Sequence, residues 1–363
     1  YKFLFIFSIM TALSVNLRIF AILIPILFIF LAVIKNFHIK DYIKSFKKIC
    51  FYLIFFFSFL IILWPYLWSD PINNFFELFK SVRGDLVNVK ILYDGSYVSN
   101  RTLPDYYLLE WIAISSPLLQ ITLFLFGFFY CFVRFIKRFI TIKEKSIYND
   151  LWRGSKEELD FICLLFLISF YFFFIFFNAP LYNGWRLVYF LNIFLLFFSI
   201  NFFSIIEIIL VKKLLNKVFY LIIISLVSYN FYAIIKTHPF QSIYFNSLIS
   251  KERKNFYEGD FHGLAVKHFF KEILSISKKN VINIGVASHT PIQRGLESFP
   301  EKLEKKLNIV GQEYSKADYI FKNNISEVNS KLIKKYHIPN NFSKIYELEV
   351  DKVIIYEIYK RNN

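Results

Sequence analysis

The stretch Asn178-Ala-Pro-Leu-Tyr-Asn-Gly-Trp-Arg-Leu-Val-Tyr-Phe190 separates two long apolar runs of the chain. Its proline, glycine and asparagines favour a tight turn, and its tryptophan and tyrosines suit the boundary between water and lipid. These features predict a short loop that joins two membrane-spanning helices. Arg186 stands where the second helix begins, and a cation drawn from there to the bilayer centre costs roughly 2.5–3.5 kcal/mol.

Two interpretations of Arg186 follow from this position. In the first, the side chain extends to the lipid headgroups and only anchors the helix. In the second, the guanidinium binds an anion at this face of the membrane, most simply a lipid phosphate.

The composition excludes a soluble protein of this size. Of 363 residues, 56% are hydrophobic and 48 are phenylalanine, and the apolar residues occur in blocks. The net charge of +16 does not require a nucleic-acid partner, because cytoplasmic loops of membrane proteins are rich in lysine and arginine. The cysteines Cys50, Cys131 and Cys163 all lie in apolar runs, so they predict neither a disulfide framework nor a metal site.

Seven apolar runs predict seven spans, judged against about 20 residues per span. They cover 3–15, 19–35, 49–67, 114–134, 159–177, 187–210 and 218–236. The first is short and no signal peptide precedes it, so we expect the true N-terminus to lie upstream of Tyr1. The organisation is thus a mostly α protein, with a transmembrane helix bundle over 1–236.

The lysine and arginine distribution predicts the orientation in the membrane. The connections at 36–48, 137–158 and 211–217 are rich in both residues, so we expect them in the cytoplasm. The alternate connections and residues 237–363 then face the extracytoplasmic side. We expect an integral protein of a bacterial inner membrane.

The long outer connection after the third span contains a predicted helix. Asp70 suits the N-cap and Pro71 the first position of this helix. An apolar stripe follows, and Arg83-Gly84 would end the helix. Such a helix lies in the plane of the interface or packs against the bundle.

Residues 237–363 are polar and mixed in charge, and they are numerous enough for a small domain. A helical stripe and strand-like runs predict an extracytoplasmic α/β domain. The stripe comprises Val266, Phe269, Phe270, Ile273 and Leu274, and the strand-like runs are 281–287, 318–321, 346–350 and 353–359.

No soluble-enzyme signature stands out in this region. His238, His262, His268 and His289 lack metal-ligand spacing, and packing or surface roles suit them better. Glu258 and Asp260 could form a carboxylate pair, although acidic residues in a polar loop are usually solvated.

Several stretches taken together resemble a known family. They are Asn16-Leu-Arg18, Trp64-Pro-Tyr-Leu-Trp-Ser-Asp-Pro71, Leu103-Pro-Asp-Tyr-Tyr107 with Ser116-Pro117, Gly184-Trp-Arg-Leu-Val-Tyr-Phe190, His238-Pro-Phe-Gln-Ser-Ile-Tyr-Phe-Asn246 and Glu258-Gly-Asp-Phe-His-Gly263. The ordered set resembles the polytopic C-type glycosyltransferases that use dolichyl- or polyprenyl-phosphate sugars. This group includes protein mannosyltransferases and the lipid A aminoarabinose transferase.

The resemblance implies inverting transfer of a sugar from a polyprenyl-phosphate donor to a lipid, glycan or protein acceptor at the outer face. From it we carry over a lipid-phosphate role for Arg186 and Arg18 alone. Asp70, Asp105, Tyr182 and Trp185 are candidate substrate-binding residues in the stretches named above. The family's catalytic acidic residue lies in the first outer loop, which we expect upstream of Tyr1. Where the family often has histidine after the arginine, this chain has Leu187. No cofactor is expected, and a divalent metal is left open.

Two other classes stay open. A transporter or flippase of a lipid-linked saccharide would place ionisable groups and broken helices near the bilayer midplane, often in paired repeats. The spans show few such groups and no evident repeat. A non-catalytic assembly protein, with an outer domain that binds a partner, is the third class.

Overall fold

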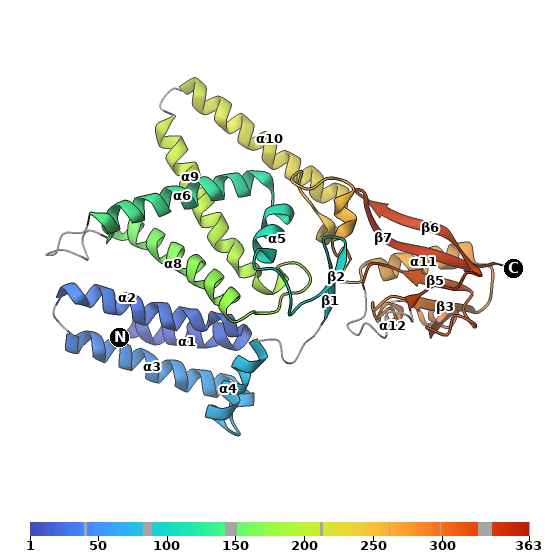
Figure 1. Ribbon diagram of the computed structural model, residues 1–363, viewed down its shortest axis with the longest axis horizontal. Helices are drawn as coiled ribbons and strands as arrows, with labels where there is room; N and C mark the ends of the chain where they lie inside the picture. The colour runs from blue at the N-terminus through green and yellow to red at the C-terminus, as the bar shows by residue number, and fades with distance from the viewer. Residues whose placement is uncertain are drawn as a thin grey trace. The chain divides into compact units, whose positions relative to one another are not determined.

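The computed structural model describes residues 1–39, 42–82, 89–141, 151–210, 213–260, 262–297, 299–325 and 336–362 (Figure 1). Contacts divide the chain into two compact units, which we call the helical unit (1–87, 122–180 and 190–209) and the mixed unit (88–121, 181–189 and 210–363). By contacts, three stretches before residue 237 therefore group with the C-terminal part. The predicted domain boundary between 236 and 237 stays a prediction.

The helical unit is built mainly from long helices that are rich in apolar residues, as expected of helices that face other helices or lipid. Its elements are α1 (Lys2–Leu17), η1 (Ile19–Ile22), α2 (Leu23–Ile39), α3 (Tyr42–Leu63), η2 (Pro65–Leu67), α4 (Pro71–Val82), most of α6 (Leu118–Ile140), α8 (Gly154–Phe176) and α9 (Asn192–Ile209). α1 packs against α3. The Tyr52 hydroxyl donates a 3.0 Å hydrogen bond to Thr11, and the Asn16 amide donates one of 2.6 Å to the carbonyl of Leu63.

Five helices are long and apolar enough to cross a membrane. They are Tyr42–Leu63, Leu118–Ile140, Gly154–Phe176, Arg186–Ile209 and Leu214–Thr237, and they correspond to the last five predicted spans. The predicted spans at 3–15 and 19–35 lie in shorter apolar helices. The orientation stays a prediction, and parts of the three expected cytoplasmic connections (40–41, 142–150 and 211–212) lie outside the described residues.

Two helix ends test the local predictions. Asp70 accepts a hydrogen bond of 3.1 Å from the backbone N–H of Asn73 and α4 begins at Pro71, so the predicted cap is confirmed. The predicted end at Arg83-Gly84 lies outside the described residues.

The fourth predicted span, 114–134, was wrong at its start, because a break at Ser116-Pro117 separates α5 (Tyr107–Ser115) from α6. A residue that precedes proline avoids helical dihedral angles.

Charged side chains connect the helices of the helical unit. Arg134 of α6 forms an ion pair with Asp160 of α8, and Asn201 of α9 donates a 2.7 Å hydrogen bond to the same carboxylate. Arg138 pairs with Glu157 at 3.1 Å. Because each charged group has a partner of opposite charge, these contacts offset the desolvation cost of burying the groups between apolar helices.

The C-terminal part of the mixed unit contains a five-stranded sheet in the order β4-β3-β5-β7-β6. Its strands are β3 (Ile282–Ala287), β4 (Leu307–Gly311), β5 (Tyr319–Lys322), β6 (Phe342–Val350) and β7 (Val353–Arg361). β3 is parallel to both β4 and β5, whereas β7 is antiparallel to β5 and β6. The predicted strands at 281–287 and 318–321 and the predicted hairpin are confirmed, and β4 is an additional strand.

Helix α11 (Ala265–Ile276) contacts β7. Of its predicted stripe, Val266, Phe269, Phe270 and Ile273 are buried, which confirms the periodicity. α12 (Gln293–Leu296) and α13 (Glu301–Glu304) are single turns between β3 and β4. The α/β character predicted for this part of the chain is therefore present.

The mixed unit also contains elements from earlier in the chain. They are β1 (Lys90–Tyr93), β2 (Ser96–Ser99), α5, the first residues of α6, part of η3 (Arg186–Leu191), α10 (Lys213–Thr237), η4 (Gln241–Ile243) and η5 (Arg253–Phe256). β1 and β2 form an antiparallel hairpin. The side chain of Asn246 donates hydrogen bonds of 2.6 and 2.7 Å to the carbonyls of Ala113 and Ser116. Segments far apart in the sequence are thus joined within one unit.

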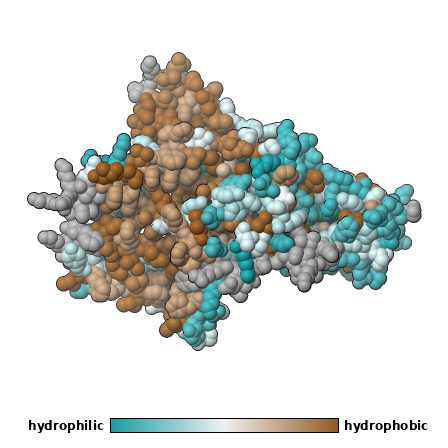
Figure 2. Space-filling model, in the orientation of Figure 1, coloured by the Kyte–Doolittle hydropathy of each residue, from teal (hydrophilic) through white to brown (hydrophobic). Residues whose placement is uncertain are grey.

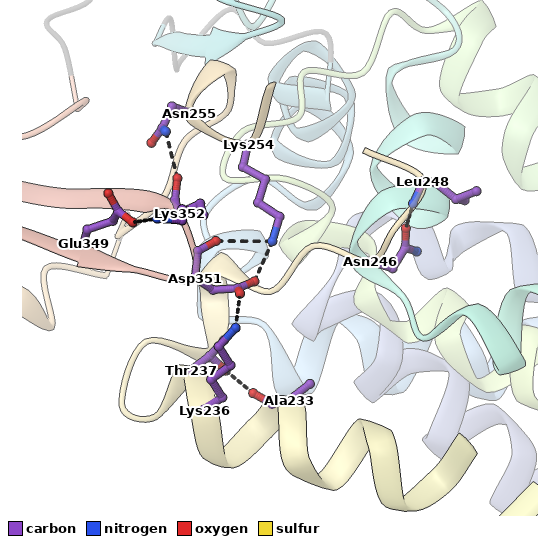
Figure 3. Close-up of polar contacts among 10 residues, drawn as sticks. All are labelled: Ala233, Lys236, Thr237, Asn246, Leu248, Lys254, Asn255, Glu349, Asp351 and Lys352. Carbon is purple, nitrogen blue, oxygen red and sulfur yellow. Dashed lines mark hydrogen bonds and ion pairs between the residues drawn. The ribbon is translucent and has the colours of Figure 1, made fainter. Parts of the chain in front are cut away.

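One carboxylate connects the end of α10 to the β6–β7 hairpin (Figure 3). Asp351, in the turn of the hairpin, pairs with Lys236 at 2.6 Å and with Lys254 at 2.5 Å. The Asn255 amide donates a 2.8 Å hydrogen bond to the carbonyl of Lys352, the next turn residue. Both turn residues have positive φ, as two-residue hairpin loops require.

The polarity of the surface differs between the helices and the C-terminal sheet. In Figure 2 the surface over the helices is largely apolar, whereas the surface over the C-terminal sheet is largely hydrophilic. Large exposed side chains on the helices, such as Phe172, Phe176 and Ile208, are expected where lipid is the solvent. The distribution fits an integral membrane protein with one water-exposed portion.

Candidate functional site

The turn at Asn183-Gly184 packs against Trp111 of α5. Asn183 and Gly184 both have positive φ, which confirms a tight turn. A Cβ on Gly184 would lie 3.2 Å from the Trp111 ring, so both the backbone angle and the space favour glycine. Trp185 is buried, and its indole N–H donates a 2.9 Å hydrogen bond to Ser115. This predicted substrate contact therefore takes part in packing.

Arg186 is exposed immediately after this turn. Its guanidinium lies 5.9 Å from the centre of the Tyr182 ring, a distance at which cation and ring attract. The positive charge of Arg186 also acts on His262. Burial is the main cause that lowers the pKa of His262, and the charge of Arg186 is the second. Arg186, Tyr182 and His262 therefore form one neighbourhood of the mixed unit.

Tyr182 and His262 also line a cavity of about 570 Å³. Its walls come from β1, from the turn at 182–183, from the start of α11 and from the loops that follow β3 and β5. All of these segments belong to the mixed unit. A cavity of this size suits a small organic ligand.

Glu258 is the carboxylate of this cavity, and it is only 4% exposed. Burial raises the pKa of Glu258 to about 8, although backbone N–H groups of Leu92 and Asn183 donate hydrogen bonds to it. These donors belong to β1 and to the turn beside Arg186. Glu258 therefore joins the three segments and presents a carboxyl that is largely protonated at neutral pH.

Asp260 has a different role, although it is equally buried. Its carboxylate accepts hydrogen bonds of 2.9 and 2.7 Å from the backbone N–H groups of Leu264 and Ala265. Burial raises the pKa of Asp260 to about 6. Asp260 thus caps the N-terminus of α11. Of the two interpretations of this acidic pair, solvation is wrong, because both side chains are only 4% exposed. Glu258 is bound by segments distant in sequence, and Asp260 by the residues that begin α11.

A hydrogen-bond network shapes the loops at the ends of β3 and β5. The Ser288 hydroxyl donates to the Asn323 side chain, whose amide donates a 2.8 Å hydrogen bond to Thr290. The backbone N–H of His289 donates to the carbonyl of Ile325 at 3.0 Å. These bonds bring the carboxyl ends of the two parallel strands together at the cavity wall, where Thr290 and Ile325 are found.

Three basic side chains line the same cavity. Lys90 comes from β1, Lys267 from α11 and Arg294 from α12. Within the described ranges, none of the three has an ion-pair partner. Glu258 is the one carboxylate among the described residues that line the cavity. The described part of the lining therefore carries an excess of basic over acidic side chains.

The other predicted site residues are divided between the two units. Asp105 is exposed just before α5 in the mixed unit. Arg18 is exposed in extended backbone between α1 and η1 in the helical unit. Asp70, also in the helical unit, caps α4. Hydrogen bonds from Asn73 lower the pKa of Asp70, which a structural role explains.

Sequence reasoning missed the cations of the cavity, because Lys90, Lys267 and Arg294 look like ordinary surface residues in the chain. Among the residues that the structure describes, no group of three or more histidines, cysteines, aspartates and glutamates could hold a metal ion. No family model, no curated protein and no solved structure matches the chain. The fold itself defines the class, an integral membrane protein whose sheet-containing part carries a cavity with an excess of basic side chains in its described lining.

Proposed function

We propose that the protein is a membrane glycosyltransferase, which moves a sugar from a polyprenyl-phosphate donor to an acceptor at the extracytoplasmic face. The observation that carries the proposal is the position of Arg186. It is exposed at the first residue of an apolar helix of membrane-spanning length, and Tyr182 beside it lines the cavity.

The chemistry of a phosphate suits this arginine. A guanidinium binds a phosphate through two parallel hydrogen bonds, a geometry that an ammonium does not reproduce. When the bond between sugar and phosphate breaks, negative charge grows on the departing lipid phosphate. A cation fixed at headgroup depth offsets this charge most strongly in the transition state, and this lowers the barrier. Arg18 is a second candidate for the same role.

The transporter alternative has less support. Transporters place ionisable groups near the middle of their spans. Arg134 and Asp160 lie about two turns from the C-terminal end of α6 and the N-terminal end of α8. Their mutual pairing, with Asn201, also satisfies both charges. A function at one face of the membrane fits these positions better than passage through the middle.

The test is a transfer assay in membranes with radiolabelled polyprenyl-phosphate sugars. Arg186→Ala should reduce transfer by ten- to a hundred-fold or more, because charge-assisted hydrogen bonds contribute about 1.5–3 kcal/mol each. Arg186→Lys should recover part of the activity, since it restores the charge without the two parallel bonds.

Arg101→Ala is the matched control. Arg101 is an exposed arginine of the same unit, in the loop after β2, and it is remote from the turn in sequence. Its substitution should leave transfer near the wild-type rate, and all variants should be present in the membrane at equal amounts. Wild-type turnover of Arg186→Ala would show that Arg186 only anchors its helix.

A further inference from the structure

The cavity lies where the topology of the sheet favours a ligand site. From β3 the chain passes to β4 on one side, and from β5 it passes to β6 and β7 on the other. The two outgoing connections therefore diverge between the carboxyl ends of β3 and β5. In open α/β sheets, ligands bind outside the carboxyl ends of the strands at such a point.

The charge of the lining indicates an anion. Lys90, Lys267 and Arg294 contribute three positive charges, and the carboxyl that faces them is largely uncharged at neutral pH because burial raises its pKa. Cations from three different elements converge on one volume. Such an arrangement is stronger evidence for an anion site than a row of lysines on one helix, because lysines on a helix surface are usually just solvated.

The rest of the lining suits a sugar. The Asn183 amide, the Thr290 hydroxyl and the Glu258 carboxyl provide donors and acceptors for hydroxyl groups. The Tyr182 ring offers a flat apolar surface for the C–H face of a sugar ring. The volume of about 570 Å³ accommodates one or two sugar rings and lies in the range of ligand cavities.

We propose that this cavity binds an anionic saccharide, in which a phosphate or carboxylate group meets Lys90, Lys267 and Arg294 and hydroxyl groups meet Glu258 and Asn183. The proposal concerns binding alone, so it stands or falls separately from sugar transfer at Arg186.

The test is a titration of the full chain in detergent, followed by calorimetry, with four probes. Glucose 1-phosphate and glucuronate combine a sugar with an anion, glucose lacks the anion, and inorganic phosphate lacks the sugar. The two charged sugars should bind saturably and at least ten-fold more tightly than either partial probe. Their affinity should fall as ionic strength rises.

Variants of α11 test the location. Lys267→Ala should weaken binding of both charged sugars about ten-fold or more. Lys271→Ala, an exposed lysine one turn along the same helix and outside the cavity lining, should change affinity less than two-fold. Equal loss in both variants would indicate general attraction to a basic surface. That result would overturn the proposal, as would an absence of saturable binding or equal binding of inorganic phosphate or neutral glucose.

Discussion

Glu258 illustrates how a buried carboxyl can control the pH dependence of folding. Its pKa is raised to about 8 in the folded protein, whereas an unfolded chain has a glutamate pKa near 4.3. The folded state therefore holds this proton more tightly than the unfolded state. The corresponding stability is fully present below the unfolded pKa and is lost as pH rises through the folded pKa.

We therefore predict that the mixed unit becomes less stable between pH 6.5 and 9, and that Glu258→Gln removes most of this decline. The window lies above the pKa of Asp260, about 6, so Asp260 contributes little to it. Thermal unfolding of the full chain in detergent at several pH values measures the effect.

Asp318→Asn is the control, because this partly exposed carboxylate pairs with Lys279 elsewhere in the same unit. It should leave the pH dependence in this window unchanged. An unaltered decline in Glu258→Gln would show that another group causes it.

The sequence alone predicts the turn and the chemical type of the site residues. It does not predict which other parts of the chain surround each of these side chains in the fold. The turn at Asn183-Gly184 and the exposure of Arg186 follow from local chemistry. The burial of Glu258 does not, because Leu92 and Asn183 come from distant parts of the chain. The lysines of the cavity escape notice for the same reason, since only the folded chain brings them together.

At the scale of the helices, the contact between α6, α8 and α9 should be a main source of stability. Asp160→Ala would leave Arg134 without its partner between apolar helices, which we expect to cost about 3–5 kcal/mol. Asp160→Asn should cost less, because it retains the hydrogen bond with Asn201. Thermal unfolding in detergent, measured by the loss of helical circular dichroism, gives the differences.

The control for Asp160 is Glu77→Ala on α4. Glu77 pairs with Lys80 on the exposed surface of the same helix, and exposed pairs contribute at most about 1 kcal/mol. Similar midpoints for Asp160→Ala and Glu77→Ala would mean that the contact between α6 and α8 contributes little.

The elements themselves were largely predictable. Long apolar runs, the cap at Asp70, the stripe on α11 and the strands β3, β5, β6 and β7 all follow from periodicity and turn chemistry. The break at Pro117 and the short strand β4 were missed. The apolar run continues through Ser116-Pro117, which hides the break. β4 is an edge strand in which only Leu307 is buried, so its sequence shows little of the apolar pattern of a buried strand.

At the scale of the whole molecule, the lysine and arginine distribution predicts that residues 237–363 are extracytoplasmic. Ser247 is exposed in this part, and Cys50 is the least buried native cysteine. In a Cys50→Ser background, Ser247→Cys should react with a membrane-impermeant maleimide in intact cells.

Ser155→Cys provides the matched control. Ser155 is exposed in the first turn of α8, within the predicted connection 137–158 that the same rule places in the cytoplasm. It should react only after the membrane is permeabilised. The opposite pattern for the two variants would invert the orientation, and the proposed outer location of Arg186 with it.

The construction of the mixed unit also sets an order of events during synthesis. The Asn246 side chain binds the carbonyl of Ala113, which precedes it by 133 residues. At about 5–20 residues per second, a ribosome needs roughly 7–27 s to make the intervening chain. Throughout that interval, α5 waits without Phe245 and Tyr257, whose rings pack against Trp111 in the finished fold. The turn with Arg186, made midway, waits as well. The cavity is thus completed only after Ile325 has been made, and a nascent chain that stalls after α9 carries Arg186 with no Glu258 beside it.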